Sequence, residues 1–140
     1  MNLNNLTTKA QECVQCAQQF AFENSHQQIE NEHLFQGILE VDDNVIPYLL
    51  GKLNINLSLL KQLNGSALKS FPKVTGGSQM FSQSASQTLM NSISIAKKQE
   101  DEYVATEHLL LALFESKSTV SKILHDQGVS KASLTSAIQE

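Results

Sequence analysis

Two Glu-His pairs are the residues of this sequence that most resemble reactive groups. Glu32-His33 begins "EHLFQGILE" and Glu107-His108 begins "EHLLLALFE", so each pair stands at the head of an apolar run. A carboxylate beside an imidazole suits acid–base chemistry or a metal ion. Neither histidine belongs to an H-x-x-x-H or H-E-x-x-H motif, which metal binding on a helix requires. We therefore expect no metal site and no catalytic residue.

Each pair also has a structural interpretation. Glu32 and Glu107 fall in the first turn of a predicted helix, where the helix dipole favours a carboxylate by about 0.3–1 kcal/mol. His33 and His108 come next and can close that turn against a neighbouring helix. In the functional alternative, each glutamate is a surface acid that holds a cationic or polar group of a partner. The residues alone leave both interpretations open.

Cys13 and Cys16 form a single C-x-x-C motif. A redox motif of this type usually begins a helix beside a βαβ unit, whereas this one lies inside a predicted helix. The sequence has no further cysteines to complete a zinc site. Gly51-Lys52 lacks the remaining residues of a phosphate-binding loop, and no G-x-S-x-G motif is present. We interpret the cysteines as packed side chains and expect no nucleotide hydrolysis by this chain.

The composition limits the class of protein and its partners. The chain has 140 residues, 41% apolar and 17% charged, which is enough to bury a core and too apolar for a disordered chain. A net charge of −4 argues against nucleic acid as a partner. No apolar run approaches the roughly 20 residues that span a bilayer, and "MNLNNLTTKA" lacks the pattern of a signal peptide. We expect a cytoplasmic protein without a membrane partner.

The sequence contains two copies of one unit. A shift of 75 residues superimposes "NEHLFQGILE" on "TEHLLLALFE", and a shift of 74 continues the match toward the end of the chain. We place repeat one at about 6–65, a connector at 66–80 and repeat two at about 81–140, within one domain that spans 1–140.

Each unit is predicted to form four helices, which gives an all-α fold of eight helices with pseudo-two-fold symmetry. In the first helix, five apolar residues keep the i, i+3, i+4, i+7 spacing of one buried stripe: Ala10, Cys13, Val14, Ala17 and Ala21. The predicted helices are 7–24, 31–40, 45–53, 57–69, 82–100, 106–116, 119–127 and 131–139.

Helix starts and ends are marked at matching places in both units. The expected N-caps are short side chains with an oxygen that accepts an N–H bond: Thr7, Asn31, Asn44, Asn56, Ser82, Thr106, Thr119 and Ser130. Asn54 and Gly128 stand where a helix ends with a left-handed residue. Pro72 and the Gly76-Gly77 pair predict a loop between the units, either a plain connector or a mobile contact loop.

Repeat two has more apolar residues than one buried stripe needs. Leu89, Met90, Ile93 and Ile95 spread over more than one face of the predicted helix 82–100. Such a surplus either lines a binding groove or seals the interface between the units.

With "TEHLLLALFE" duplicated as "NEHLFQGILE" on an eight-helix plan, the chain resembles the Clp N-terminal (Clp R) domain family over essentially its whole length. The segments "LNNLTTKAQECVQCAQ", "FPKVTGG" and "VSKILHDQGV" make it most similar to the ClpB disaggregase branch. The resemblance implies a substrate-recruiting module ahead of two AAA+ ATPase rings, assembled as a homohexamer. Unfolded or aggregated polypeptides are the implied partners, together with a partner chaperone system that binds other domains. ATP and Mg²⁺ would be bound in the parent's ATPase modules, with no cofactor in this domain.

The resemblance also assigns site residues. Three positions match family residues linked to substrate handling: Thr7, Asp101 and Glu107. A groove for apolar segments is expected to be lined by Leu89, Met90, Ile93 and Leu109. In ClpC-type relatives two glutamates hold phosphoarginine, and Glu32 and Glu107 match them.

Four functions remain to be compared. The expected one is substrate recruitment for a ClpB-like disaggregase. The alternative is an adaptor- or phosphoarginine-binding N-domain of a ClpC- or ClpA-like unfoldase linked to a protease. A small enzyme that uses the cysteines or the Glu-His pairs, and a structural spacer, are the other two. Of the two glutamates, we expect Glu107 to be functional, because Asp101 and the surplus apolar residues lie beside it.

Overall fold

The computed structural model describes residues 3–75 and 79–139. Within these residues the chain forms eight α-helices, one short 3-10 helix and two two-residue strands, which confirms the all-α prediction. Each predicted helix is present, with ends within two residues of those expected. The predicted Gly76-Gly77 loop lies outside the described residues. The elements are η1 (Leu3–Asn5), α1 (Thr8–Glu23), β1 (Gln28–Ile29), α2 (Asn31–Val41), α3 (Val45–Lys52), α4 (Leu57–Lys69), β2 (Met80–Phe81), α5 (Gln83–Lys98), α6 (Thr106–Glu115), α7 (Thr119–Asp126) and α8 (Lys131–Gln139).

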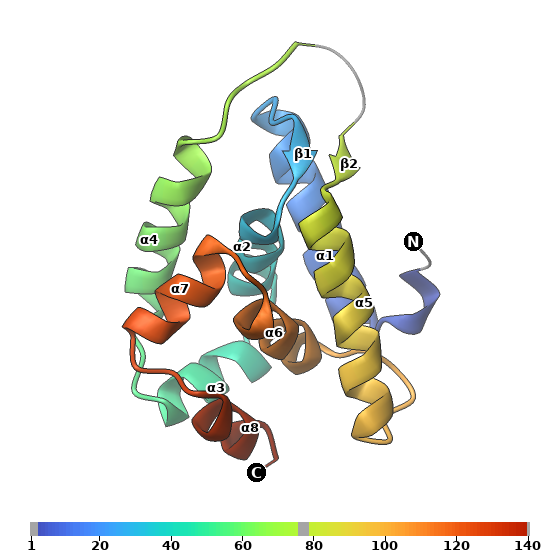
Figure 1. The fold of residues 1–140 in the computed structure, drawn as a ribbon, viewed down its shortest axis with the longest axis vertical. Helices are drawn as coiled ribbons and strands as arrows, with labels where there is room; N and C mark the ends of the chain where they lie inside the picture. Colours follow the sequence, from blue (N-terminus) through green and yellow to red (C-terminus); the bar gives the residue numbers. More distant parts are fainter. Residues whose placement is uncertain (1–2, 76–78, 140) are drawn as a thin grey trace.

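The contacts between the two groups of four helices are reciprocal, as a pseudo-two-fold duplication requires. Helix α2 contacts α7 as α6 contacts α3, and α4 contacts α7 as α8 contacts α3. Helices α2 and α6 occupy the middle of the molecule, with the other helices around them (Figure 1). Most residues of both central helices are buried, including their first turns. The core of the domain is therefore built around two helices that begin inside the protein.

Two short parallel pairings connect the repeats, and the sequence analysis did not predict them. Strand β1 pairs with β2, and Leu6 forms an isolated parallel bridge with Val104. Leu6 corresponds to Phe81 of β2 in the other repeat, and Val104 corresponds to Ile29 of β1, each after a shift of 75 residues. The two pairings are therefore related by the internal symmetry. Each pairing involves one or two residues per strand, which is too short for a period-two pattern in the sequence. In both, the segment before the first helix of one repeat lies along the segment before the second helix of the other.

The first helix of each repeat begins as predicted. The hydroxyl of Thr7 accepts a hydrogen bond from the backbone N–H of Ala10 at 3.1 Å, and Ser82 accepts one from Ala85 at 3.0 Å. Asn56 and Ser130 also accept such bonds at the starts of α4 and α8. The predicted left-handed residues are confirmed at Asn54 (φ 59°) and Gly128 (φ 88°).

The predicted N-caps of the second helices, Asn31 and Thr106, are wrong. Both residues lie inside the first turn, and the N-cap positions belong to the residues before them. The Nδ1 atom of His33 accepts the backbone N–H of Glu30 at 2.9 Å, and the Nδ1 atom of His108 accepts that of Ala105 at 2.8 Å. In both repeats, therefore, a buried imidazole at the third helical position accepts the backbone N–H of the N-cap residue, which is the part that Glu or Gln plays in a capping box.

The predicted caps of the third helices also differ from the structure. Asn44 occupies the N-cap position of α3 without a side-chain cap bond, and Thr119 is the first residue of α7 rather than its cap. The Oδ1 atom of Asp42 accepts the backbone N–H groups of Asn44 and Val45 at 2.9 and 2.8 Å. A carboxylate two residues ahead of Asn44 therefore satisfies the start of α3.

Helices α1 and α2 pack closely because Gly37 has no side chain. A Cβ at this position would collide with the backbone carbonyl of Cys13, which belongs to α1. Gly51, in α3, faces open space. Only the first of these glycines is needed for packing.

We expect Gly37→Ala to lower the free energy of unfolding by about 1–3 kcal/mol, because the new methyl group must push two packed helices apart. The matched variant Gly51→Ala should leave stability unchanged or raise it slightly, because alanine favours the helix. Urea unfolding of both variants measures the difference. Equal stabilities of the two variants would contradict the packing argument.

His33 belongs to a buried pair with His26. Its Nδ1 atom accepts a hydrogen bond, so the neutral ring carries its proton on Nε2, which lies 2.7 Å from Nδ1 of His26. Phe20 and Phe71 surround the two rings. Burial, and then the neighbouring His26, lowers the pKa of His33 to about 4. A second proton on His33 would also occupy the atom that accepts the N–H of Glu30.

The domain should lose stability as the pH falls below 6.5. Between about pH 6.5 and pH 4 the unfolded chain binds a proton at His33 that the folded chain does not, so the free energy of unfolding decreases. We expect a loss of about 2 kcal/mol between pH 7 and pH 5 from this residue. Denaturant titrations of the wild type, His33→Gln and the exposed control His125→Gln test this. A pH dependence that is as steep in His33→Gln as in the control would contradict it.

Candidate functional site

The structure corrects the groove expected from the sequence. Leu89 is 0% exposed and Leu109 is 2% exposed, because α5 and α6 turn these residues into the core. Neither can line an accessible surface. Met90 is 59% exposed on α5, and Ile93 is half-buried against the core. The surplus of apolar residues in α5 is therefore divided between the core and the surface.

Three residues were assigned to substrate handling by the family resemblance, and they lie around the start of α6. The backbone N–H of Thr7 donates to the carbonyl of Val104 at 2.9 Å, two residues before α6 begins. Asp101 accepts a hydrogen bond from Nε2 of His108 at 2.9 Å, because the Nδ1 atom of that ring already accepts a backbone N–H. Glu107 stands next to His108 in the first turn of α6. The structure thus brings Thr7, Asp101 and Glu107 into one region.

The two glutamates of the Glu-His pairs have different surroundings. Glu32 is 7% exposed, and the backbone and hydroxyl of Thr119 donate hydrogen bonds to its carboxylate. Burial raises the pKa of Glu32, and the bonds from Thr119 oppose this shift. Glu107 is half-buried, and no other described residue hydrogen-bonds to its carboxylate. Glu32 joins α2 to the start of α7, whereas Glu107 is available to a ligand.

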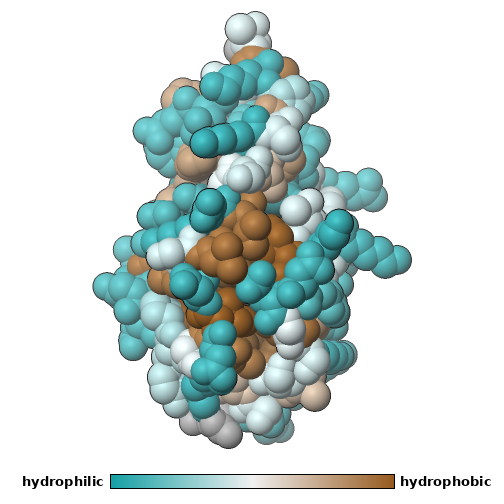
Figure 2. All heavy atoms as spheres, turned by 90° about the vertical axis from the view of Figure 1, so that its left-hand side faces the viewer, coloured by the Kyte–Doolittle hydropathy of each residue, from teal (hydrophilic) through white to brown (hydrophobic). Residues whose placement is uncertain are grey.

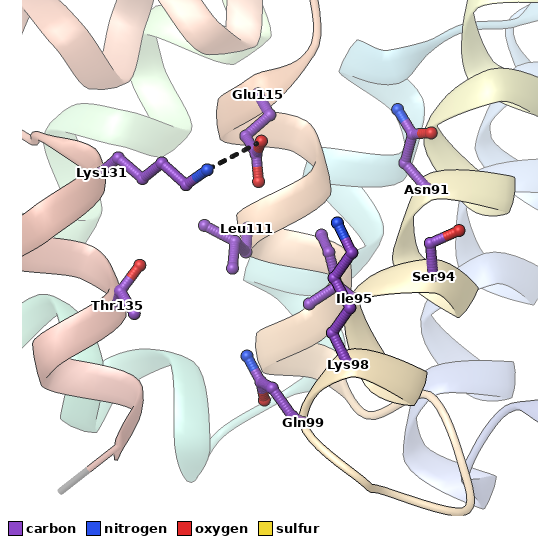
Figure 3. A pocket seen from close by; sticks show the side chains of 9 residues that line it. All are labelled: Asn91, Ser94, Ile95, Lys98, Gln99, Leu111, Glu115, Lys131 and Thr135. Carbon is purple, nitrogen blue, oxygen red and sulfur yellow. Dashed lines mark ion pairs between the residues drawn. The ribbon is translucent and has the colours of Figure 1, made fainter.

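A cleft between α5, α6 and α8, which we call the repeat-two cleft, combines apolar and polar groups. It has a volume of about 360 Å³. Ile95 of α5 and Leu111 of α6 form its apolar part, and Lys131 of α8 forms an ion pair with Glu115 at 3.6 Å on its edge (Figure 3). The remaining lining residues are polar: Asn91, Ser94, Lys98, Gln99 and Thr135.

The repeat-two cleft is connected to the start of α6. The side-chain oxygen of Gln99, which lines the cleft, lies 3.1 Å from Nε2 of His108. The same nitrogen contacts Asp101. Asp101, one of the acidic residues expected from the family, is therefore linked to this cleft through His108 and Gln99. The sequence pattern marks Ile95 only as a surplus apolar residue and does not single out Leu111, because both look like core residues in a helical pattern.

A second apolar surface lies on another side of the molecule. Apolar side chains gather in the middle of the face that carries α4 and α7 and are surrounded by hydrophilic residues (Figure 2). In α4, Leu57 and Leu63 are partly buried and Leu59 is 36% exposed. The three leucines of α4 belong to repeat one, unlike the residues of the repeat-two cleft.

The cysteines are placed for packing rather than for redox chemistry. Burial raises the pKa of Cys13 to about 12 and also raises the pKa of Cys16, so their thiolate forms are disfavoured at neutral pH. Among the residues that the structure describes, no group of three or more histidine, cysteine, aspartate or glutamate side chains could hold a metal ion. In the same part of the chain, no helix combines the length and apolar character needed to cross a membrane.

Removing the carboxylates should separate the two glutamates by their effect on stability. Glu32→Ala leaves the start of α7 without its acceptor, and we expect a loss of about 1–2 kcal/mol in the free energy of unfolding. Glu107→Ala should stay within about 0.5 kcal/mol of the wild type, because no described residue donates a hydrogen bond to this carboxylate. Urea unfolding at pH 7 measures both. Equal losses would mean that Glu107 has a structural role as well.

Comparison with known proteins agrees with the resemblance. A family model, described as the Clp repeat (R) N-terminal domain, matches residues 5–127. The chaperone protein ClpB of Bacteroides thetaiotaomicron is 38% identical over 140 residues, which are 100% of this chain and 16% of the relative. ClpB of Clostridium tetani is 33% identical over 146 residues, which cover 100% of this chain and 17% of the relative. The chain thus spans about one sixth of the length of these relatives.

Solved structures have the same fold. The Hsp104 N-terminal domain from Candida albicans matches with a TM-score of 0.84 and 20% identity, covering 96% of this chain and 89% of that one. A ClpV N-domain in complex with a VipB peptide matches with a TM-score of 0.79 and 15% identity, covering 96% and 87%. The family match, the ClpB relatives and the duplicated eight-helix fold agree. The chain belongs to the Clp repeat (R) N-terminal domain family.

Proposed function

We propose that this domain recruits unfolded or aggregated proteins for a ClpB-like disaggregase by binding their exposed apolar segments weakly. The observation that carries the proposal is the repeat-two cleft, where Ile95 and Leu111 lie beside polar and charged side chains. ClpB relatives that match the whole chain support the type of parent protein. The parent's AAA+ rings, their ATP and Mg²⁺, and a cytoplasmic location belong to the same proposal.

The shape and chemistry of the cleft suit weak, sequence-tolerant binding. A volume of about 360 Å³ accommodates one or two large side chains rather than a folded surface. Apolar burial stabilises the complex by about 25 cal/mol for each Å² removed from water, and ordering of the bound segment offsets part of this. A recruiting domain must release its client to the ring, so modest affinity fits this role. The complex of the ClpV N-domain with a VipB peptide supports the ability of this fold to hold a peptide.

Acidic residues near the cleft favour clients with basic side chains. Asp101 and Glu107 flank His108, and Gln99 connects His108 to the cleft. We assign Asp101 and Glu107, together with Thr7, to the edge of the client-binding region. Met90 and Ile93 extend it along α5 in this proposal.

An adaptor- or phosphoarginine-binding role remains the alternative, with one observation in its favour. A hollow of about 530 Å³ contains Glu32 together with Lys117, Lys122 and the start of α7. A ligand that carries both charges, such as phosphoarginine, could meet the carboxylate and the lysines together. Its guanidinium group would have to displace the hydrogen bonds that Thr119 makes to Glu32. The unengaged Glu107 is the easier of the two glutamates to reach.

Substitution of Ile95 tests the client-binding proposal. We expect Ile95→Ser to weaken binding of reduced and alkylated lysozyme, a permanently unfolded basic protein, by about fivefold, because part of the apolar contact is lost. Tyr48→Ser is the matched control, since Tyr48 is 57% exposed on α3, away from the cleft. Fluorescence anisotropy with labelled client measures both affinities, and circular dichroism verifies the fold.

The same measurement with Met90→Ser distinguishes two positions of the client site, the repeat-two cleft and the outer face of α5. Loss of binding in Met90→Ser with normal binding in Ile95→Ser would move the client site to the outer face of α5. Normal binding in both variants would overturn the proposal.

A further inference from the structure

The repeat-two cleft has a counterpart in repeat one. A cleft of about 370 Å³ lies between the end of α1, α2 and α4, and we call it the repeat-one cleft. Five of its lining residues occupy the positions that line the repeat-two cleft, one repeat length earlier in the chain. The pairs are Phe20 with Ile95, Asn24 with Gln99, Gln36 with Leu111, Glu40 with Glu115, and Lys61 with Thr135. The duplication has therefore produced two equivalent clefts with different side chains.

The repeat-one cleft is basic. It is lined by Lys61, Lys69 and Lys73, with Glu40 as its acidic residue. Lys61 lies 3.8 Å from the carboxylate of Glu40, which leaves Lys69 and Lys73 without an ion-pair partner among the described residues. The chain as a whole carries a net charge of −4, so this local excess of positive charge opposes the general charge of the domain. Basic side chains in a cleft attract anionic groups.

The backbone of Lys73 is fixed beside the cleft. His26, a lining residue that is 3% exposed, forms an isolated antiparallel bridge with Lys73. The N–H of Val74 donates to the carbonyl of Ser25 at 2.8 Å. Phe71 packs edge-on against the ring of His26 at 5.7 Å. The connector residue that supplies a lysine is thus attached to the loop after α1, which lowers the entropy lost when that lysine binds a ligand.

The cleft also has an apolar part. Phe20 is half-buried and is the apolar side chain that a ligand can reach, whereas Leu68 is 2% exposed and belongs to the core. Gly65 of α4 lines the cleft, and a Cβ at this position would meet no atom within 4 Å. An apolar side chain can therefore enter beside the lysines.

We propose that the repeat-one cleft is a second peptide-binding site, selective for segments in which aspartate or glutamate flanks a large apolar residue. Lys69 and Lys73 bind the carboxylates, and Phe20 contacts the apolar side chain. This goes beyond the proposed recruitment of apolar and basic segments, and it does not depend on the repeat-two cleft being occupied. One domain would then accept two chemically different kinds of segment at two places related by its internal symmetry.

The test uses the fluorescein-labelled peptide DDLFDD and the neutral peptide SSLFSS. DDLFDD should bind the wild-type domain roughly tenfold more tightly than SSLFSS, and this preference should decrease in high salt. The double variant Lys69→Glu, Lys73→Glu should lose about tenfold in affinity for DDLFDD and little for SSLFSS. Both lysines are exposed, so the fold should persist.

A second variant blocks the cleft without changing its charge. Gly65→Gln fills the open space beside Leu68 and should weaken binding of both peptides, whereas Gly51→Gln, the same change at a glycine in α3 that faces open space, should not. Wild-type affinity for DDLFDD in the lysine variant or in Gly65→Gln would overturn the proposal. Loss of DDLFDD binding in Ile95→Ser, with binding intact in the lysine variant, would assign the acidic peptide to the other cleft and would equally overturn it.

Discussion

The rest of the structure depends on two helices that begin inside the protein. The first turns of α2 and α6 are buried, and unsatisfied N–H groups there would destabilise the fold. His33 and His108 satisfy one backbone group each, and the side chains of the same turns bond across the repeat interface. Asn31 donates to Ser84 at 2.8 Å, and Thr106 donates to Asp42. The polar groups at the centre therefore determine how the two repeats are arranged.

The symmetry of the duplication is broken by the carboxylates at the helix starts. In repeat one, Asp42 serves the start of α3 and also accepts the bond from Thr106. The corresponding part of repeat two has no such carboxylate, and Glu32 of the other repeat serves the start of α7. Glu107, the sequence equivalent of Glu32, is left without this task. Of these two equivalent glutamates, Glu32 supports the fold, whereas the carboxylate of Glu107 accepts no hydrogen bond from the other residues that the structure describes.

Sequence patterns predicted the helices well and the site poorly, for physical reasons. The helical stripes and the caps at Thr7 and Ser82 follow local rules, so residue types and spacing were sufficient. The caps at Asn31 and Thr106 were wrong because each N-cap lies one residue earlier, where the imidazole of His33 or His108 accepts the backbone N–H of the N-cap residue. Leu89 is core and Ile95 lines a cleft, although both are apolar residues of one helix. Which residues of α5 pack on α6 and which line the cleft depends on tertiary packing. The repeat alone did not reveal the charge of the repeat-one cleft.

The crossed parallel pairings have a consequence for folding. Leu6 pairs with Val104, and β1 pairs with β2, so each repeat supplies the backbone that orders the entrance to a central helix of the other. These contacts join segments far apart in the chain, which raises contact order and slows the search for the native topology. If one repeat unfolds, the other repeat loses the backbone pairing at the entrance to its central helix. The two repeats, although each looks like a small bundle, should therefore unfold as one cooperative unit rather than as separate foldons.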